Sequence, residues 1–428
     1  MSESSERAIT SHFLLANLDP RNRERLLLLT LAAIQFIHVL DSLLVMPLGP
    51  QFMRDLSLTP AMFGALVSAY SLAAAAAGLA GAFVLDRFDR KYALVTLLFG
   101  LVAATFICGI AKDFSILVGG RILAGACGGL IQALLFTIIG DCFPEARRGN
   151  ATGTVMSAYS VATVLGVPSA LFLAGQGNWS LPFIVLAACG FFVFLASIAL
   201  IPPLKGHLLH AARSARALER GSKKSAFLAL ILKQNSRHAF LMIITLMFAG
   251  FTVIPYMSAY LSSNLGLSHQ DLATVFFAGG VATFATARWI GRLSDRFGKR
   301  IMFNWLALAS AVPTLVLTHA KPMSMIAVLF VTTSFILLLA ARGIPALSLI
   351  TASVGPGLRG RFLSLTSSLQ QASSGLASLL TGLFLSQAPD GHLTNYNWAG
   401  DLSVVFILCS VLVVNRLRPV GSQTSVSN

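Results

Sequence analysis

The sequence contains few charged residues for its length. Only 11% of its 428 residues are Asp, Glu, Lys or Arg, whereas 56% are hydrophobic. Soluble globular domains have roughly 25% charged and about 45–50% apolar residues, so the composition excludes a soluble protein and indicates a membrane protein. Apolar runs such as Leu26–Ile34 do not alternate with polar residues, as the strands of a membrane β-barrel would. The membrane spans are therefore predicted to be helices.

Motifs of enzymes, cofactor sites and metal sites are also absent. There is no G-x-x-x-x-G-K-[ST] loop, which argues against ATP-driven transport by this chain, and no H-E-x-x-H or G-x-S-x-G motif. The five cysteines form no C-x-x-C pair, so neither a disulfide framework nor a zinc site is indicated. We expect no enzymatic activity, no cofactor and no resident metal. The cysteines are Cys108, Cys127, Cys142, Cys189 and Cys409.

Apolar windows separated by charged, Gly, Pro or Asn breaks predict an all-α membrane protein of twelve helices. Two bundles of six helices, 26–202 and 239–416, are joined by a basic linker, 203–238, and flanked by tails 1–25 and 417–428. The predicted helices are 26–53, 62–86, 92–111, 114–141, 151–174, 181–202, 239–262, 271–294, 301–319, 323–352, 361–386 and 400–416.

The net charge of +15 is explained by membrane orientation. Of the 31 Lys and Arg residues, 25 fall on one side of the predicted spans and 3 on the other. Because basic loops stay in the cytoplasm, both termini are expected there, in a bacterial inner membrane, and no nucleic-acid partner is expected. The linker is interpreted as a solvated tether; the alternative is a contact with anionic lipid or a soluble partner.

Three short motifs recur in the same order in the two halves, at offsets of 209, 212 and 219 residues. Duplicated six-helix bundles are an architecture used for alternating access around a midplane site. The pairs are Asp86–Lys91 with Asp295–Arg300, Pro144–Gly149 with Pro356–Gly360, and Asn178–Trp179 with Asn397–Trp398.

The segment Gly291–Arg300 resembles the cytoplasmic loop motif of the major facilitator superfamily. The first-half copy departs from the motif, with Ala82 and Asp89 at two of its glycine positions. The resemblance implies a gate that latches the two halves in the outward-facing state. The implied gate residues are Asp86, Arg87, Arg90, Gly291, Asp295, Arg296, Gly298 and Arg300.

Two further motifs refine the resemblance. Arg121–Gly129 is similar to the helix-four motif of proton-coupled members, and Gly166–Pro168 partly matches the antiporter motif. The chain therefore resembles the drug/proton antiporter-like branch. More narrowly, segments Leu18–Arg21, His38–Asp41 and Met46–Pro50 look like those of the magnetosome permeases of magnetotactic bacteria. That resemblance implies transport of an iron complex across the magnetosome membrane in support of magnetite biomineralisation.

Asp41 is the only acid near the middle of a predicted helix, where an ionisable side chain is costly and indicates function. His38 and Gln35 share its helix face, and Arg121 is predicted at a comparable depth. A contact between Asp41 and Arg121 that breaks during the cycle would bind and release a proton, which His38 could relay. The alternative is a permanent ion pair that fixes the first helix against the fourth.

The overall prediction is a monomeric secondary active transporter that moves a small solute or an ion complex by alternating access, with proton coupling. A scaffold or receptor that recruits partners through the basic linker is a rival of another class. The expected substrate-cavity residues are Gln35, Thr252, Tyr256, Tyr260, Thr333 and Arg342, assigned from the family resemblance.

Overall fold

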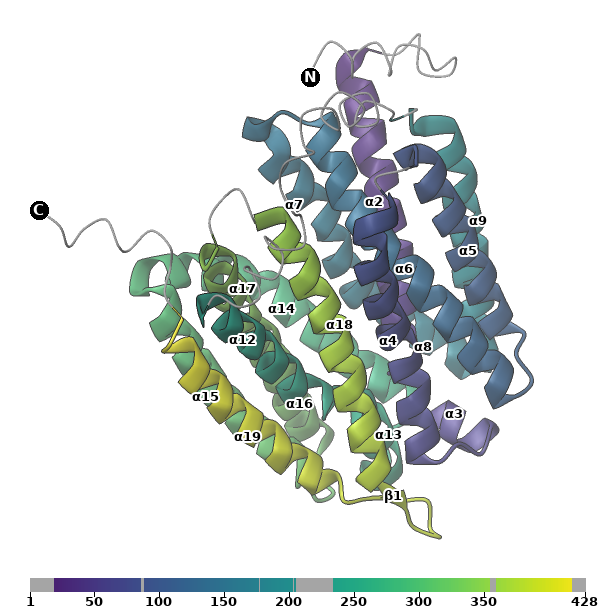
Figure 1. Cartoon of the computed structure of the whole chain (residues 1–428). Coiled ribbons are helices and arrows are strands. Elements are labelled where there is room, and N and C mark those ends of the chain that lie inside the picture. The colour runs from purple at the N-terminus through teal and green to yellow at the C-terminus, as the bar shows by residue number, and fades with distance from the viewer. Residues whose placement is uncertain are drawn as a thin grey trace, which may run out of the picture.

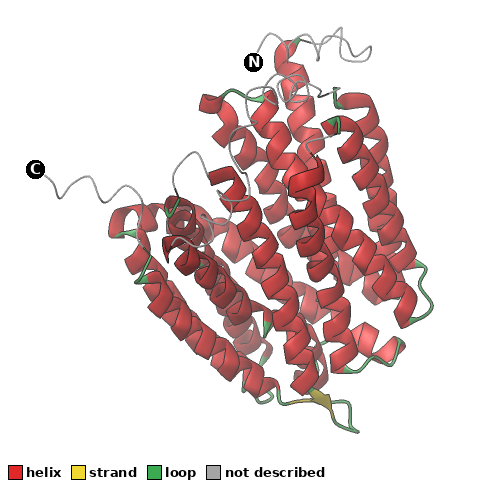
Figure 2. Cartoon of the chain, viewed as in Figure 1, coloured by secondary structure: helices red, strands yellow, loops and turns green. Residues whose placement is uncertain are grey.

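The computed structural model describes residues 19–85, 88–176, 178–202, 204, 234–354 and 359–417. In this part of the chain the helices run side by side in two bundles, one for each half of the sequence (Figure 1). Figure 2 shows that helices account for nearly all of the described residues, with one small hairpin at the end of the molecule opposite the labelled termini. The all-helical fold predicted from the sequence is confirmed.

The first bundle holds the helices of the N-terminal half. They are α2 (Pro20–Leu44), α3 (Gly49–Asp55), α4 (Pro60–Val84), α5 (Arg90–Gly109), α6 (Phe114–Cys142), α7 (Glu145–Val161), the π-helical turn η2 (Ala162–Gly166), α8 (Val167–Gln176) and α9 (Ser180–Leu200).

The second bundle holds the C-terminal half and the hairpin. Its elements are α12 (Gln234–Phe251), α13 (Ile254–Leu265), α14 (His269–Phe297), α15 (Lys299–Thr318), α16 (Met325–Ala341), α17 (Gly343–Ala352), α18 (Arg359–Phe384), β1 (Ser386–Gln387), β2 (Leu393–Thr394) and α19 (Tyr396–Val414).

Proline explains where the structure departs from the predicted helix ranges. The predicted helix 26–53 instead begins at Pro20, which occupies the first helical turn, and breaks after Leu44, just before Pro47. The predicted helix 239–262 divides before Pro255, and 323–352 divides at Arg342, three residues before Pro345. In the predicted helix 151–174, the π-helical turn falls just before Pro168, which has no N–H to donate.

Eleven spans in the described residues are long and apolar enough to cross a membrane. The helix α18 is as long as these spans but carries many Ser and Gln residues, and it is not among the eleven. With α18 as the twelfth, the helices match the twelve predicted from the sequence. We call the end of the bundles that holds Arg90, Arg148 and Arg300 the basic end, and the end that holds α3 and the hairpin the far end.

The halves meet along α4 and α18, which pack antiparallel through small residues spaced by seven. A Cβ added to Gly64 would lie 2.9 Å from the Ser378 carbonyl oxygen, and one added to Gly78 would lie 2.9 Å from the Ser368 hydroxyl. Between them, a Cβ on Gly375 would meet the Ser71 Cβ at 3.1 Å. Because only small residues let helix backbones approach so closely, this stripe sets the distance between the halves.

Candidate functional site

Asp41 lies on α2 in the interior of the first bundle, with no exposed side-chain surface. Its Oδ2 atom accepts a hydrogen bond from Nη1 of Arg121 at 3.1 Å, and the same Nη1 donates to the Asp41 carbonyl oxygen at 3.1 Å. Its Oδ1 atom accepts a hydrogen bond from the Thr105 hydroxyl at 2.8 Å. The contact between Asp41 and Arg121 predicted from the sequence is thus present, and both carboxylate oxygens are engaged.

Arg121 is held on α6 by a close crossing with α4. A Cβ on Gly125 would lie 2.2 Å from the Tyr70 carbonyl oxygen, and one on Gly129 would lie 2.4 Å from that of Ala74. Glycine at both positions lets the two helices touch through their backbones. The crossing places the Tyr70 ring against Arg121, whose guanidinium carbon lies 4.4 Å from the ring centroid, a cation–π distance.

The other two residues predicted on the Asp41 face, His38 and Gln35, are also buried, with 3% and 1% of their surface exposed. Neither ring nitrogen of His38 has a hydrogen-bond partner among the described residues, and the same holds for Gln35 Oε1. A Cβ on Gly128 of α6 would lie 3.1 Å from His38 Nε2. His38 therefore faces α6, one turn of α2 away from the ion pair.

The arrangement suits a carboxyl group that changes its protonation state. In the ionised state, Arg121 and Thr105 compensate the buried charge of Asp41, which would otherwise be strongly unfavourable. The Thr105 hydroxyl also lies 2.8 Å from the Leu101 carbonyl oxygen. Since a hydroxyl can both donate and accept, Thr105 can donate to the carboxylate, or accept from a protonated Asp41 while it donates to Leu101.

The second half does not repeat this site. The repeated motifs are offset by 209 and 212 residues. With the first offset Gly250 is equivalent to Asp41, and with the second Thr333 is equivalent to Arg121. Thr105 does have a threonine counterpart, Thr314, whose hydroxyl donates only within its own helix, to the Ser310 carbonyl oxygen at 2.7 Å. The charged pair is thus specific to the first half.

Sequence reasoning missed Thr105 and Tyr70, since neither differs locally from the many hydroxyl and aromatic residues of the spans. A signal for Tyr70 does exist: Gly125 and Gly129 are four residues apart, a spacing that indicates a close helix crossing. That spacing does not predict which helix crosses α6, so it could not identify Tyr70.

The predicted gate residues that the structure describes lie at the basic end. Arg90 Nη1 lies 2.9 Å from Asp141 Oδ2 within the first half, and Arg300 donates to the Leu417 carbonyl oxygen within the second. Asp295, Arg296 and Gly298 are exposed, and Gly291 is half-buried. Gly298 has φ of +93°, a conformation that favours glycine.

Among the described residues, no ion pair joins Asp295 to the first half. Two further predicted gate residues, Asp86 and Arg87, lie outside the described part of the chain. In the described part of the chain, Asp295 therefore forms no ion pair that would latch the two halves together.

At the far end, by contrast, the two halves are joined by buried contacts. The hydroxyl of Tyr256 on α13 donates to the Ser378 carbonyl oxygen at 2.9 Å and lies 3.4 Å from that of Pro60 in the first half. Its ring packs edge-on against Phe63 at 5.6 Å. Gln51 Nε2 also lies 3.4 Å from Nε2 of His269 in the second half. In Figure 1 the two bundles diverge toward the basic end. The molecule is therefore closed at the far end.

The remaining predicted cavity residues lie in several different environments. Thr252 is buried and donates to the Phe248 carbonyl oxygen at 3.0 Å, while Tyr260 donates to that of Ala320 at 2.7 Å. Thr333 is half-buried on α16. Arg342 is 1% exposed, and its Nη1 lies 3.4 Å from the Ser310 hydroxyl on α15. Arg342 therefore points into the second bundle.

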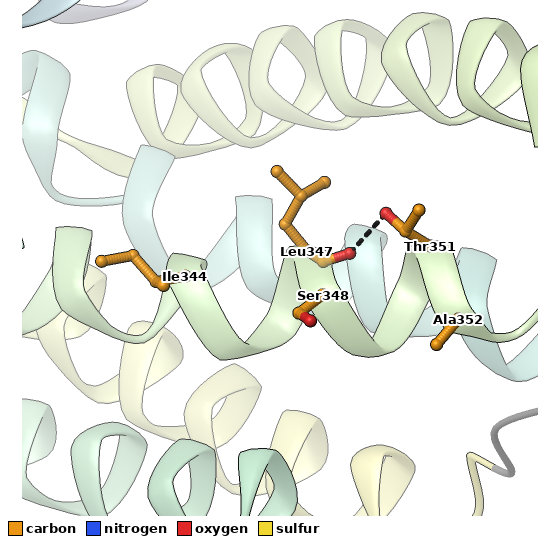
Figure 3. Close-up of a pocket in the computed structure, with 5 residues that line it drawn as sticks. All are labelled: Ile344, Leu347, Ser348, Thr351 and Ala352. Carbon is orange, nitrogen blue, oxygen red and sulfur yellow. Dashed lines mark hydrogen bonds between the residues drawn. The ribbon is translucent and has the colours of Figure 1, made fainter. Parts of the chain in front are cut away.

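A cavity of about 530 Å³ lies along α17 near the basic end. Figure 3 shows the residues that line it, which come from one face of this helix. The Thr351 hydroxyl donates to the Leu347 carbonyl oxygen at 2.7 Å, so this hydroxyl is already bonded to its own helix. The lining is otherwise mostly apolar and carries no charge. The lining residues are Ile344, Leu347, Ser348, Thr351 and Ala352.

Comparison with known proteins identifies the class. The sequence profile described as Major Facilitator Superfamily matches residues 31–419. The chain therefore belongs to this superfamily of transporters. It is similar to the MFS-type transporter YtbD of Bacillus subtilis, with 26% identity over 386 residues, which covers 88% of this chain and 92% of YtbD. A chloramphenicol efflux pump of Mycobacterium tuberculosis is 25% identical over 283 residues, 65% of each chain.

Solved structures show the same fold. A bacterial homologue of the human lysosomal transporter Spinster, in an inward-facing and occupied conformation, superposes with a TM-score of 0.71 at 17% identity and covers 91% of this chain and 96% of that one. A D-xylose–proton symporter superposes with a TM-score of 0.72 at 14% identity and covers 92% and 98% of the two chains. The fold predicted from the sequence is confirmed, and the chain is a multi-pass membrane protein of a secondary-transporter family.

Proposed function

We propose that this protein is a proton-coupled secondary transporter that works by alternating access, with Asp41 as the proton-binding group. The observation that carries the proposal is the buried contact between Asp41 and Arg121, in which one carboxylate oxygen is bonded to Arg121 and the other to Thr105. Protonation of Asp41 would break the ion pair and release Arg121. Such a change alters the packing of α2 against α6, which is how proton binding would favour one conformation over the other.

The direction of opening follows from the distribution of basic residues. The end that carries most of the Lys and Arg residues is proposed to be cytoplasmic, in the inner membrane of a bacterium, with both termini on that side. The closed contacts of Tyr256 and Gln51 then lie on the outer side, so the structure corresponds to an inward-facing state. In the outward-facing state, the exposed Asp295 loop would latch the halves at the cytoplasmic side.

The chemistry of the α17 cavity favours a small and largely apolar solute. Its lining residues include Leu347, which is 60% exposed, and no charged side chain. Relatives in this family include a chloramphenicol efflux pump of Mycobacterium tuberculosis and a chloramphenicol resistance protein of Streptomyces lividans. We infer that chloramphenicol, a small solute of this kind, is a suitable first substrate to assay, and that transport is outward in exchange for protons.

Iron transport in a magnetosome membrane remains a second prediction, which rests on the resemblance of the N-terminal segments alone. In the described residues no three His, Cys, Asp or Glu side chains gather as a metal site would require. Arg121 beside Asp41 would also repel a bare cation. Iron would therefore have to travel as a chelate or an anionic complex.

The experiment that tests the proposal reconstitutes the protein in proteoliposomes and measures solute flux with and without a pH gradient. Chloramphenicol and ferric citrate are the two test solutes. The proposal predicts that a pH gradient drives accumulation of chloramphenicol several-fold above the level reached without one. Accumulation of ferric citrate but not of chloramphenicol would favour the iron alternative. A flux of either solute that is equal with and without the pH gradient would contradict proton coupling.

A further inference from the structure

Four buried polar groups lie beside the ion pair without hydrogen-bond partners among the described residues. They are Gln35 Oε1, both ring nitrogens of His38, the Tyr70 hydroxyl and Nε of Arg121. Leaving one such group unpaired costs about 1–3 kcal/mol, so a bound molecule that paired even two of them would stabilise the site. The rest of the site cannot pair them, because Thr105 and Arg121 Nη1 are already bonded to Asp41.

Two of these groups, from Tyr70 and His38, come together beside Gly128, where three helices meet. A Cβ built on Gly128 of α6 would lie 2.4 Å from the Tyr70 hydroxyl of α4 and 3.1 Å from Nε2 of His38 on α2. Two unpaired polar atoms from different helices thus converge on the one residue that has no side chain. A buried water needs two to four polar partners, and the convergence supplies them.

We propose that Gln35, His38, Tyr70 and Gly128 form an internal water site that passes the coupling proton between His38 and Asp41. The proposal rests on the function proposed above and adds a path to it, because Asp41 has no exposed surface of its own. Only protons move. One ring nitrogen of His38 takes up a proton while the N–H of the other releases one, so the imidazole is neutral before and after the step. The released proton crosses the bound water and joins a carboxylate oxygen of Asp41. The bond from Arg121 to that carboxylate breaks, and the guanidinium keeps its charge.

The Tyr70 ring has a separate role in the same step. When Asp41 becomes neutral, the positive charge of Arg121 remains buried, and the ring 4.4 Å away stabilises it through its negative face. Other titratable groups near the pocket are the thiols of Cys127 and Cys108. Asp41 and Arg121 form the ion pair of the pocket.

Two variants test the water site without removing the ion pair. Gly128→Ala places a methyl group against the Tyr70 hydroxyl and His38 Nε2 and leaves no room for water between them. Tyr70→Phe keeps the ring against Arg121 and removes only the hydroxyl. The matched control is Gly140→Ala on the same helix, where no described atom lies within 4 Å of the added Cβ.

The readout is the infrared band of the protonated Asp41 carboxyl in purified protein after a pH jump, assigned by its loss in Asp41→Asn. We expect the wild type and Gly140→Ala to protonate at the same rate, and Gly128→Ala and Tyr70→Phe to be slower by at least about tenfold, since a positioned proton relay typically contributes about 10²–10⁴-fold. Melting temperatures close to that of the wild type show that the variants fold.

The outcomes separate the two proposals. Equal protonation rates in all four proteins would overturn the water site and leave Asp41 as the coupling group. If no carboxyl band that depends on Asp41 appears in the wild type at any pH, the proposed function itself fails, and the water site fails with it. Slowing in Tyr70→Phe alone would also overturn the site around Gly128.

Discussion

Thr105 offers a quantitative test of how the buried carboxylate of Asp41 is stabilised. In Thr105→Val the side chain keeps its shape but loses the hydroxyl that donates to Oδ1 at 2.8 Å. A hydrogen bond to a charged group is worth about 1.5–3 kcal/mol. Its loss leaves one oxygen of a fully buried carboxylate without a partner, so the free energy of unfolding should fall by about 1.5–3 kcal/mol.

The assay follows the unfolding of the purified variant and of the wild type on heating. Thr314→Val is the matched control, because Thr314 occupies the equivalent position in the second half, is equally buried, and donates only to its own helix. The control should lose clearly less stability than Thr105→Val. A free energy of unfolding in Thr105→Val that stays at the wild-type value would refute the assigned role of the hydroxyl.

Three further predictions concern packing. Gly125→Ala puts a Cβ 2.2 Å from the Tyr70 carbonyl oxygen, so the crossing helices must separate, and stability should fall by about 1–3 kcal/mol in thermal melting, unlike Gly140→Ala. Tyr256→Phe removes the hydrogen bond to the Ser378 carbonyl oxygen, worth about 0.5–1.5 kcal/mol, so amide exchange across α13 should speed up about two- to tenfold. Gly64→Ala places its Cβ 2.9 Å from the same oxygen and should also speed exchange there. Unchanged exchange in both variants would contradict the packing of Tyr256 against α4 and α18.

The sequence was sufficient to predict the fold class and the charged pair for clear physical reasons. Backbone groups inside a membrane must be hydrogen-bonded within the protein, so long apolar runs form membrane helices. A single acid at the middle of a span needs a partner, and Arg121 was the basic residue predicted at the same membrane depth as Asp41. The break near Pro345 was predicted from Gly343 and Pro345, whereas those at Pro47 and Pro255 were missed because the apolar runs continue through them. Proline interrupts hydrogen bonding without changing hydropathy.

The positions of hydroxyl and aromatic side chains could not be predicted. Tyr256 was expected in the substrate cavity, and in this state it joins the two halves at the far end. Arg342 was expected there too, and its guanidinium points toward Ser310 in the second bundle. The face of a helix that contacts a neighbour depends on how two segments far apart in sequence cross. The hydropathy of the sequence does not predict that crossing.

The central claim, that protonation of Asp41 couples transport to the proton gradient, is tested most directly in proteoliposomes that contain Asp41→Asn. The measurement compares pH-gradient-driven accumulation of chloramphenicol with its exchange across the membrane in the absence of a gradient. Asparagine keeps the shape of the side chain but cannot take up a proton. The account predicts that gradient-driven accumulation is lost while exchange continues; accumulation by Asp41→Asn at the wild-type level would contradict it.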